Sequence, residues 1–249
     1  MQHVSLSFSA AQHAKQIMQG YPEARLPART NTECGVYLAC GLGYYSALLV
    51  ERGASVVFAY DISAPMVAGA RAAFPSSAYP DLHFAVADCS DISKFPSHGE
   101  LFDVVFAAWF LNYAGTETEL TSMFRVIATN LAAGGRFIGI TTNVADPCAK
   151  EDRKDFYGLD VEVMEKKYIA PDTGREVGVS ARVTVRTETP FSFDVFMFRR
   201  EVYERAAKLA GMGIRWREAI VPNDEREEEG YWSEWLKRPT FSVLEAVKL

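Results

Sequence analysis

The chain has 249 residues, of which 49% are hydrophobic, with a net charge of −6 at pH 7 and a pI near 5.4. This length suffices for one α/β domain, alone or with a modest insertion. Because no Lys/Arg cluster is interleaved with aromatic residues, nucleic acid is not an expected partner. No apolar run approaches the roughly 20 residues needed to span a bilayer, so no membrane segment is expected.

The four cysteines lack the paired short spacing of a zinc site, so the sequence predicts free thiols, no bound metal and a cytoplasmic location. Residues 1–33 are rich in small and polar side chains. They include a helical pattern near residues 10–19, followed by an irregular stretch.

From Gly35 onward the pattern alternates between strands and helices. The predicted strands are Val36–Ala39, Ser55–Tyr60, Leu82–Val86, Phe102–Ala107 and Gly135–Thr141. The predicted helices are Tyr45–Arg52, Pro65–Phe74, Asp91–Lys94 and Glu117–Leu131, the last ending in a tight turn through Gly134 and Gly135. Strands joined by helices predict an α/β fold with a doubly wound, mostly parallel sheet.

The pattern becomes β-rich after Asn143. Predicted strands are Phe156–Ala170, Val177–Thr187 and Phe191–Phe198, followed by a helix at Arg199–Ala210, a last strand at Ile214–Val221 and an aromatic tail at Tyr231–Phe241 that packs over the sheet edge. Since about 55 residues form only a small core, residues 144–198 are predicted to be an insertion or cap within a single domain spanning residues 1–249.

A glycine turn, Gly41-Leu42-Gly43, follows the first strand, and Asp61 ends the second. Glycines between a strand and a helix let a ligand approach the backbone, and an acid at the next strand tip can accept both hydroxyls of a ribose. The pair therefore indicates a nucleoside-containing cofactor. Ser46 stands where a dinucleotide site prefers a third glycine, which leaves NAD open, and no Lys-Ser/Thr pair completes a phosphate loop.

Two further strand tips narrow the choice. Asp88 follows the third strand, where a carboxylate can accept a hydrogen bond from an adenine amino group. The small residues Ala107 and Ala108 end the fourth strand and leave room for the reacting end of a ligand.

Together these residues resemble the class I S-adenosylmethionine-dependent methyltransferases. Val36 to Gly43 is similar to the first motif of this family, and Asp61, 18 residues after Gly43, to its ribose-binding acid. The segment Ala87-Asp88-Cys89 resembles the adenine motif, and LAAGGRF from Leu131 resembles a conserved turn. The segments FSFDVFMF and YWSEWLKRPTF look like the toxoflavin-synthase-like subgroup of small-molecule enzymes. The chain departs from the family pattern at Tyr37, where an acid is usual, and at Tyr45, where a glycine is usual.

The resemblance implies a seven-stranded Rossmann-like sheet, S-adenosyl-L-methionine as cofactor, and residues 1–33 as a lid over it. The implied cofactor-binding residues are Tyr21, Arg29, Ala39, Cys40, Gly41, Gly43, Asp61, Ile62, Met66, Asp88, Cys89, Ala107 and Trp109. The candidate acceptor-binding residues are Tyr113, Asn143, Asp146 and Tyr157. Within the lid, an aromatic ring would stabilise a sulfonium by a cation–π contact, and an arginine would pair with the methionine carboxylate.

The expected function is methyl transfer to an N, O or C nucleophile of a small molecule in specialised metabolism. None of the four histidines stands at a strand tip, so no general base and no catalytic residue is assigned. Two alternatives stay open: an NAD-dependent oxidoreductase, and a protein of this fold that binds the cofactor without transferring methyl groups. The oligomeric state is open as well.

Overall fold

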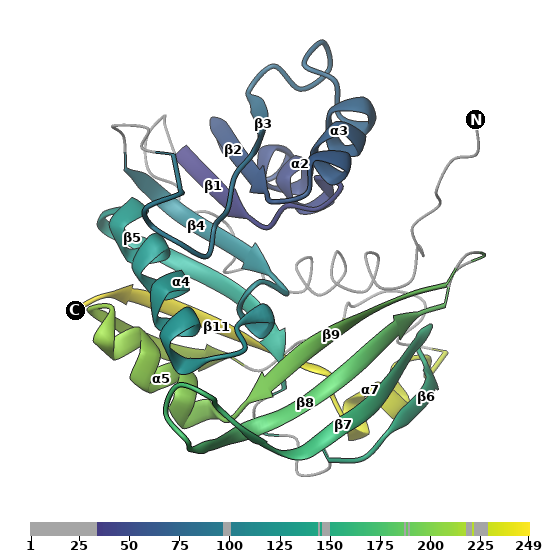
Figure 1. The fold of residues 1–249 in the computed structure, drawn as a ribbon. Helices are drawn as coiled ribbons and strands as arrows, with labels where there is room; N and C mark the ends of the chain where they lie inside the picture. The colour runs from purple at the N-terminus through teal and green to yellow at the C-terminus, as the bar shows by residue number, and fades with distance from the viewer. Residues whose placement is uncertain are drawn as a thin grey trace.

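The computed structural model describes residues 34–96, 101–143, 145, 150–186, 188, 190–217, 221 and 229–249. The predicted helix near residues 10–19 lies outside this part of the chain. Figure 1 shows a large twisted sheet with helices on both faces and a smaller sheet beside it. Within the described residues, no helix is long and apolar enough to cross a membrane.

The large sheet has seven strands in the order β10-β11-β5-β4-β1-β2-β3. Strands β1 to β5 run parallel, whereas β11 pairs antiparallel with both β5 and β10. This arrangement confirms the predicted α/β, doubly wound, mostly parallel seven-stranded sheet. The strands are β1 Cys34–Leu38, β2 Val56–Asp61, β3 Leu82–Val86, β4 Phe102–Ala108, β5 Leu131–Thr142, β10 Met212–Arg217 and β11 Phe241–Lys248. The helices are α2 Tyr44–Glu51, α3 Ala64–Ala73, α4 Glu117–Asn130, α5 Arg200–Leu209 and α7 Ser233–Lys237, with the short 3-10 helix η2 at Leu111–Tyr113.

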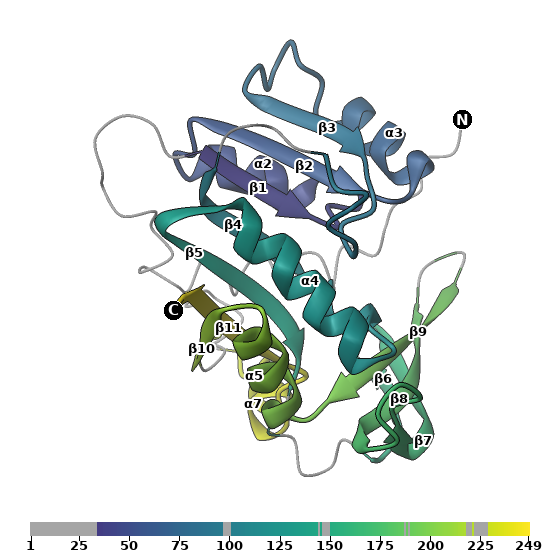
Figure 2. The same ribbon diagram turned by 60° about the vertical axis from the view of Figure 1, so that its left-hand side comes forward.

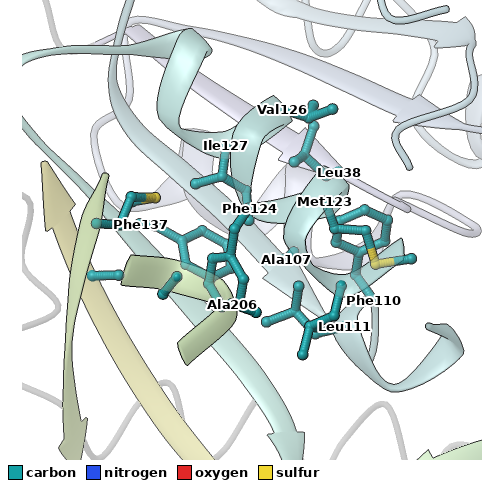
Figure 3. Close-up of a cluster of buried hydrophobic side chains, with 14 of the residues drawn as sticks. Leu38, Ala107, Phe110, Leu111, Met123, Phe124, Val126, Ile127, Phe137 and Ala206 are labelled. Atoms are coloured by element: carbon teal, nitrogen blue, oxygen red, sulfur yellow. The ribbon is translucent and has the colours of Figure 1, made fainter. Parts of the chain in front are cut away.

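Alternate residues of the central strands face different helices. In β1, Val36 and Leu38 belong to the core under α4 and α5, while Tyr37 belongs to the core under α2 and α3. Side chains alternate across a strand, so a strand covered on both faces is apolar at every position. Figure 3 shows the first of these cores, where Phe124 of α4 lies close to Phe137 of β5 and to Ala206 of α5.

Helix α4 begins where its sequence provides a complete cap. The Thr116 hydroxyl accepts a hydrogen bond from the Glu119 N–H at 3.0 Å, and the Glu119 carboxylate accepts one from the Thr116 N–H at 3.2 Å. This reciprocal capping satisfies two N–H groups that otherwise lack helical partners. The start of α4 is therefore well defined directly after η2, at the end of the sheet where β4 stops.

Three local predictions were wrong. The segment Asp91–Lys94 is a single turn, in which the Asp91 carbonyl accepts the N–H groups of Lys94 and Phe95 at 3.0 Å and no further helical turn follows in residues 95–96. Strand β5 begins at Leu131, directly after α4, and the tight turn through Gly134 is a bulge inside the strand. The last strand of the sheet is β11, whereas the segment predicted as last forms β10, which ends at Arg217.

The β-rich insertion forms a second, antiparallel sheet in the order β6-β7-β8-β9. Its strands are β6 Arg153–Phe156, β7 Leu159–Ile169, β8 Glu176–Val185 and β9 Phe191–Phe198. This cap sheet lies beside the start of α4 in Figure 2. The predicted β-rich cap is confirmed.

Hydrogen bonds join the cap to the large sheet's domain. The Tyr168 hydroxyl donates to the Gly115 carbonyl at 2.8 Å, and the Asp172 carboxylate accepts from the N–H of Thr118 at 2.8 Å. The Thr173 hydroxyl donates to Glu117 at 2.9 Å. The β7–β8 turn is thus bound to the first residues of α4.

Candidate functional site

The glycine turn at the end of β1 leaves open space beside its backbone. Gly41 and Gly43 have φ angles of +53° and +80°. A Cβ atom at Gly43 would lie 2.6 Å from the Phe84 ring, so this glycine is required for packing against β3. Among the described residues, a Cβ atom at Gly41 would meet no atom within 4 Å, so none of them blocks a ligand's approach to this backbone.

Two residues without the freedom of glycine also adopt left-handed backbone conformations here. Ala39 has a φ angle of +58° at the end of β1, and Trp109 one of +61° at the end of β4. These strands are direct neighbours in the sheet. A left-handed conformation costs an L-residue about 1–2 kcal/mol. Strain of this kind concentrates at functional sites, and here it marks the carboxyl ends of two adjacent strands.

Asp61 connects the ends of β1 and β2. Its Oδ2 accepts the N–H of Gly41 at 2.8 Å, and its Oδ1 accepts the N–H of Ser63 at 2.9 Å. An ionised carboxylate has about four acceptor positions, so two are left for a ligand's hydroxyl groups. The apolar side chains of Ile62 and Met66 follow directly and are 70% and 38% exposed. An acid with free acceptor positions thus lies next to uncovered apolar surface.

Asp88 is held more tightly than Asp61. Its Oδ1 accepts hydrogen bonds from the Ser90 N–H at 3.0 Å and the Ser90 hydroxyl at 2.6 Å, and Lys94 Nζ donates to Oδ2 at 3.1 Å. The hydrogen bonds from Ser90 lower the pKa of Asp88, and Lys94 adds to the shift. Asp88 therefore stays ionised and organises the turn after β3.

The two cysteines of the site are buried neutral thiols. Burial raises the pKa of Cys89 to about 12, and the charges of Asp61 and Asp88 add to the shift. Burial and then Asp61 likewise raise the pKa of Cys40. Because only the thiolate form of cysteine is nucleophilic, neither residue is reactive at neutral pH. These cysteines can therefore contribute to ligand binding only through the shape of their loops and the backbone groups of those loops.

The end of β4 is closed by aromatic packing. The Trp109 N–H donates to the Ile140 carbonyl of β5 at 2.9 Å, and its ring meets Phe241 edge-on with centroids 5.8 Å apart. Phe241 in turn contacts Trp235 of α7 at 5.1 Å. The Ala107 side chain belongs to the core under α4, so only its backbone is available to a ligand.

Tyr113 differs from Asn143 and Tyr157, because 48% of it is exposed. Its ring lies 6.0 Å from Phe193 of β9. Burial and then the charge of Asp61 raise the pKa of Tyr113, which places this side chain in the electrostatic field of the candidate cofactor acid. The 3-10 helix η2 thus places the half-exposed ring of Tyr113 against β9 of the cap.

Asn143 and Tyr157 bind the C-terminal part of the chain. Asn143 donates to the Pro239 carbonyl at 2.9 Å and accepts from Ser242 at 3.2 Å. The Tyr157 hydroxyl donates to the Tyr231 carbonyl at 2.6 Å, and its ring stacks on Trp232. These contacts hold α7 and its flanks in place. Tyr21, Arg29 and Asp146 lie outside the described residues.

Sequence reasoning did not single out Asn112. Asn112 is almost fully buried on η2, and within the described part of the chain its Oδ1 has no hydrogen-bond partner. A buried acceptor without a partner is unusual and points to a missing group. The signal in the sequence is a polar residue between Leu111 and Tyr113, directly after the tip of β4.

The unusual residues of the first motif are buried. Tyr37 stacks on Phe106 at 5.1 Å and lies 6.1 Å from Tyr45. Burial raises the pKa of Tyr37 well above its usual value, so it carries no negative charge at neutral pH. The position that usually holds an acid in the resembled family is therefore a neutral ring between α2 and the sheet.

Comparison with known proteins agrees with this geometry. Residues 36–139 match a family model described as a methyltransferase domain. No curated protein matches the chain.

Three solved structures illustrate the structural similarity. A putative S-adenosylmethionine-dependent methyltransferase from Listeria monocytogenes aligns with a TM-score of 0.64 and 18% identity, over 96% of this chain and 99% of that one. An S-adenosylmethionine-dependent methyltransferase from Mesorhizobium loti aligns with a TM-score of 0.60 and 22% identity, over 90% and 94%. The glycopeptide N-methyltransferase MtfA, complexed with S-adenosyl-L-methionine, aligns with a TM-score of 0.58 and 15% identity, over 91% and 86%.

At these identities the structural alignments establish the fold, and the family match covers the strands and loops that build the site. The similarity to the toxoflavin-synthase-like subgroup stays a prediction. Residues 36–139 are therefore similar to a methyltransferase domain, and they lie in a seven-stranded sheet with the Rossmann-like fold of these methyltransferase structures.

Proposed function

We propose that this protein transfers the methyl group of S-adenosylmethionine to an N, O or C nucleophile of a small molecule. One observation carries the proposal: the Asp61 carboxylate holds the Gly41 N–H at 2.8 Å beside open space, inside a matched methyltransferase domain. An acid at the second strand tip with acceptor positions to spare suits the two hydroxyls of a ribose.

The other residues of this edge suit the remaining parts of the cofactor. Asp88 is ionised and accepts a hydrogen bond from the adenine amino group, while Ile62 and Met66 offer apolar surface to the ring. The backbone from Ala39 to Gly41 borders the methionine end. Cys40, Gly43, Cys89, Ala107 and Trp109 shape the loops around it, and Tyr21 and Arg29 of the proposed lid, residues 1–33, close over it.

When bound, the cofactor would supply a methyl group that its sulfonium activates towards a lone pair of the acceptor, with the electrons of the carbon–sulfur bond left on sulfur. The chain's residues align acceptor and methyl group and exclude water. Such positioning lowers a barrier by about 7–11 kcal/mol. In the described residues His83 is the one histidine, and it lies within β3, away from the strand tips. An aromatic nitrogen or an acidic hydroxyl therefore fits best as the acceptor atom.

The cap is the acceptor side of the site in this proposal, with its boundaries at residues 144–198 inside a single domain. Strand β9 packs on the segment that follows β4, where a Cβ atom at Gly115 would lie 3.2 Å from the Phe196 ring. The glycopeptide specificity of one structural neighbour supports a small-molecule acceptor and a role in specialised metabolism. The cytoplasmic location predicted from the sequence stays a prediction.

Cofactor binding without methyl transfer is the second candidate, because Tyr37 places a neutral buried ring where the resembled family usually has an acid. The test combines calorimetry with S-adenosylhomocysteine and incubation with methyl-labelled S-adenosylmethionine and a panel of acceptors. Binding with turnover supports methyl transfer, and binding without turnover across the panel supports the second candidate. No binding of S-adenosylhomocysteine, together with a thermal shift by NAD, would instead favour an oxidoreductase.

A further inference from the structure

The end of the cap nearest η2 has one apolar and one polar face. Directly paired residues of β8 and β9 share a face: Val183 pairs with Phe193, and Val185 pairs with Phe191. The intervening pairs point the other way. Arg182 binds Asp194 at 2.7 Å, and Thr184 bonds to Ser192 at 2.8 Å. The charged and hydroxyl groups of this stretch therefore lie on one face, and aliphatic and aromatic groups on the other.

Tyr113 lies against the apolar face. Its ring and that of Phe193 are tilted by 41° with centroids 6.0 Å apart, and Phe193 stacks on Phe191 at 6.2 Å. Tyr113 is 48% and Phe191 40% exposed, although both belong to this aromatic cluster. Exposed aromatic side chains that lie together beside a candidate ligand site favour a binding role for this cluster.

The chemistry of the cluster is neutral. Burial and then Asp61 raise the pKa of Tyr113, so its hydroxyl is a phenol that donates or accepts a hydrogen bond. Among the described residues of the β8–β9 apolar face, none is charged. This face therefore offers no ion-pair partner to a charged ligand.

We propose that the acceptor is a flat, uncharged aromatic ring system that stacks in the cluster of Tyr113, Phe191 and Phe193, next to the cofactor. This inference rests on the proposed methyl transfer and adds the substrate class. Aromatic rings bind one another in offset or edge-on geometry, which a planar acceptor satisfies with Phe193 while its nucleophilic edge points toward the tip of β4. The Tyr113 hydroxyl holds the ring's polar substituent.

The alternative explanation is that the three rings only pack the cap against η2. The two explanations differ in what Phe193→Leu does. Stacking on a ligand predicts weaker acceptor binding with unchanged cofactor binding, whereas packing predicts a lower melting temperature with unchanged acceptor affinity. Tyr79→Leu is the control, because Tyr79 stacks edge-on with Phe74 beside α3 and is not part of the cluster.

The experiment measures binding of 7-hydroxycoumarin, 1-naphthol and 5-hydroxyindole, each beside a saturated counterpart, to protein saturated with S-adenosylhomocysteine. We expect at least one aromatic probe to bind tighter than its saturated counterpart, and Phe193→Leu to weaken it by roughly 2- to 10-fold. Tyr113→Phe should weaken the same probe and leave S-adenosylhomocysteine affinity unchanged.

Two results would overturn the inference while leaving methyl transfer intact: no aromatic probe preferred over its counterpart, or an effect of Phe193→Leu no larger than that of Tyr79→Leu. If the unmodified protein does not bind S-adenosylhomocysteine, the proposed function on which the inference rests is itself wrong.

Discussion

Asp61→Asn tests the site most directly, because it changes one atom of the carboxylate and nearly none of its volume. In the structure Oδ2 accepts the Gly41 N–H at 2.8 Å and Oδ1 accepts the Ser63 N–H at 2.9 Å. An asparagine keeps one acceptor oxygen and replaces the other with an NH₂ group, which repels a backbone N–H. One charge-assisted hydrogen bond of about 1.5–3 kcal/mol is lost. If the ribose depends on the same carboxylate, S-adenosylhomocysteine affinity falls roughly 10- to 150-fold.

Asp103→Asn is the matched control. Its Oδ2 accepts the N–H of Cys34 at 3.2 Å, so it also binds a backbone amide, but at the opposite end of β1. Calorimetry should show unchanged affinity for this variant, and thermal unfolding should show that both variants are folded. An Asp61→Asn protein that binds S-adenosylhomocysteine within 3-fold of the unmodified protein would refute the assignment of the ribose acid.

Three further predictions concern stability and reactivity. Ala39→Gly relieves the left-handed backbone conformation at φ +58° and, after the entropy cost of glycine is subtracted, should raise the free energy of unfolding by about 0.5–1 kcal/mol. A lower free energy of unfolding in a urea titration would show that Ala39 is not strained. Glu117→Gln weakens the ion pair with Arg205 and should lower the free energy of unfolding by about 1–3 kcal/mol, with the change absent when Arg205 is also replaced by Gln. Burial raises the pKa of Cys89 to about 12, so at pH 8 iodoacetamide should label it far more slowly in the folded than in the urea-unfolded protein, and equal rates would contradict this burial.

The strands of the large sheet were predictable where local pattern decides them. β1, β2 and β3 are short β-branched or apolar runs bounded by Gly, Asp or Pro-rich turns, and the structure has them within one or two residues of the predicted bounds. β11 was not predictable in this way. Its residues Leu244-Glu245-Ala246 favour a helix in isolation, and only antiparallel pairing with β5 makes them a strand.

The same distinction between local pattern and long-range contact applies to the residues of the candidate site. Asp61 and the glycine turn are defined by their place at strand tips, which the sequence shows. The partners of Asn143 and Tyr157 are residues 74 to 99 positions away, and no local pattern reports such contacts. The apolar face of the cap depends on which residues pair across β8 and β9, so the sequence shows the aromatic residues but not the side they share.

The hydrogen bonds between the β7–β8 turn and the start of α4 limit the population of any form in which the cap is swung away. Swinging the cap away would break the hydrogen bonds of Tyr168, Asp172 and Thr173. At about 1 kcal/mol each, the open form would lie about 3 kcal/mol higher and make up roughly 1% or less of the molecules. The cap therefore stays against the start of α4 in nearly all molecules, so under the proposed function an acceptor would meet an already assembled site.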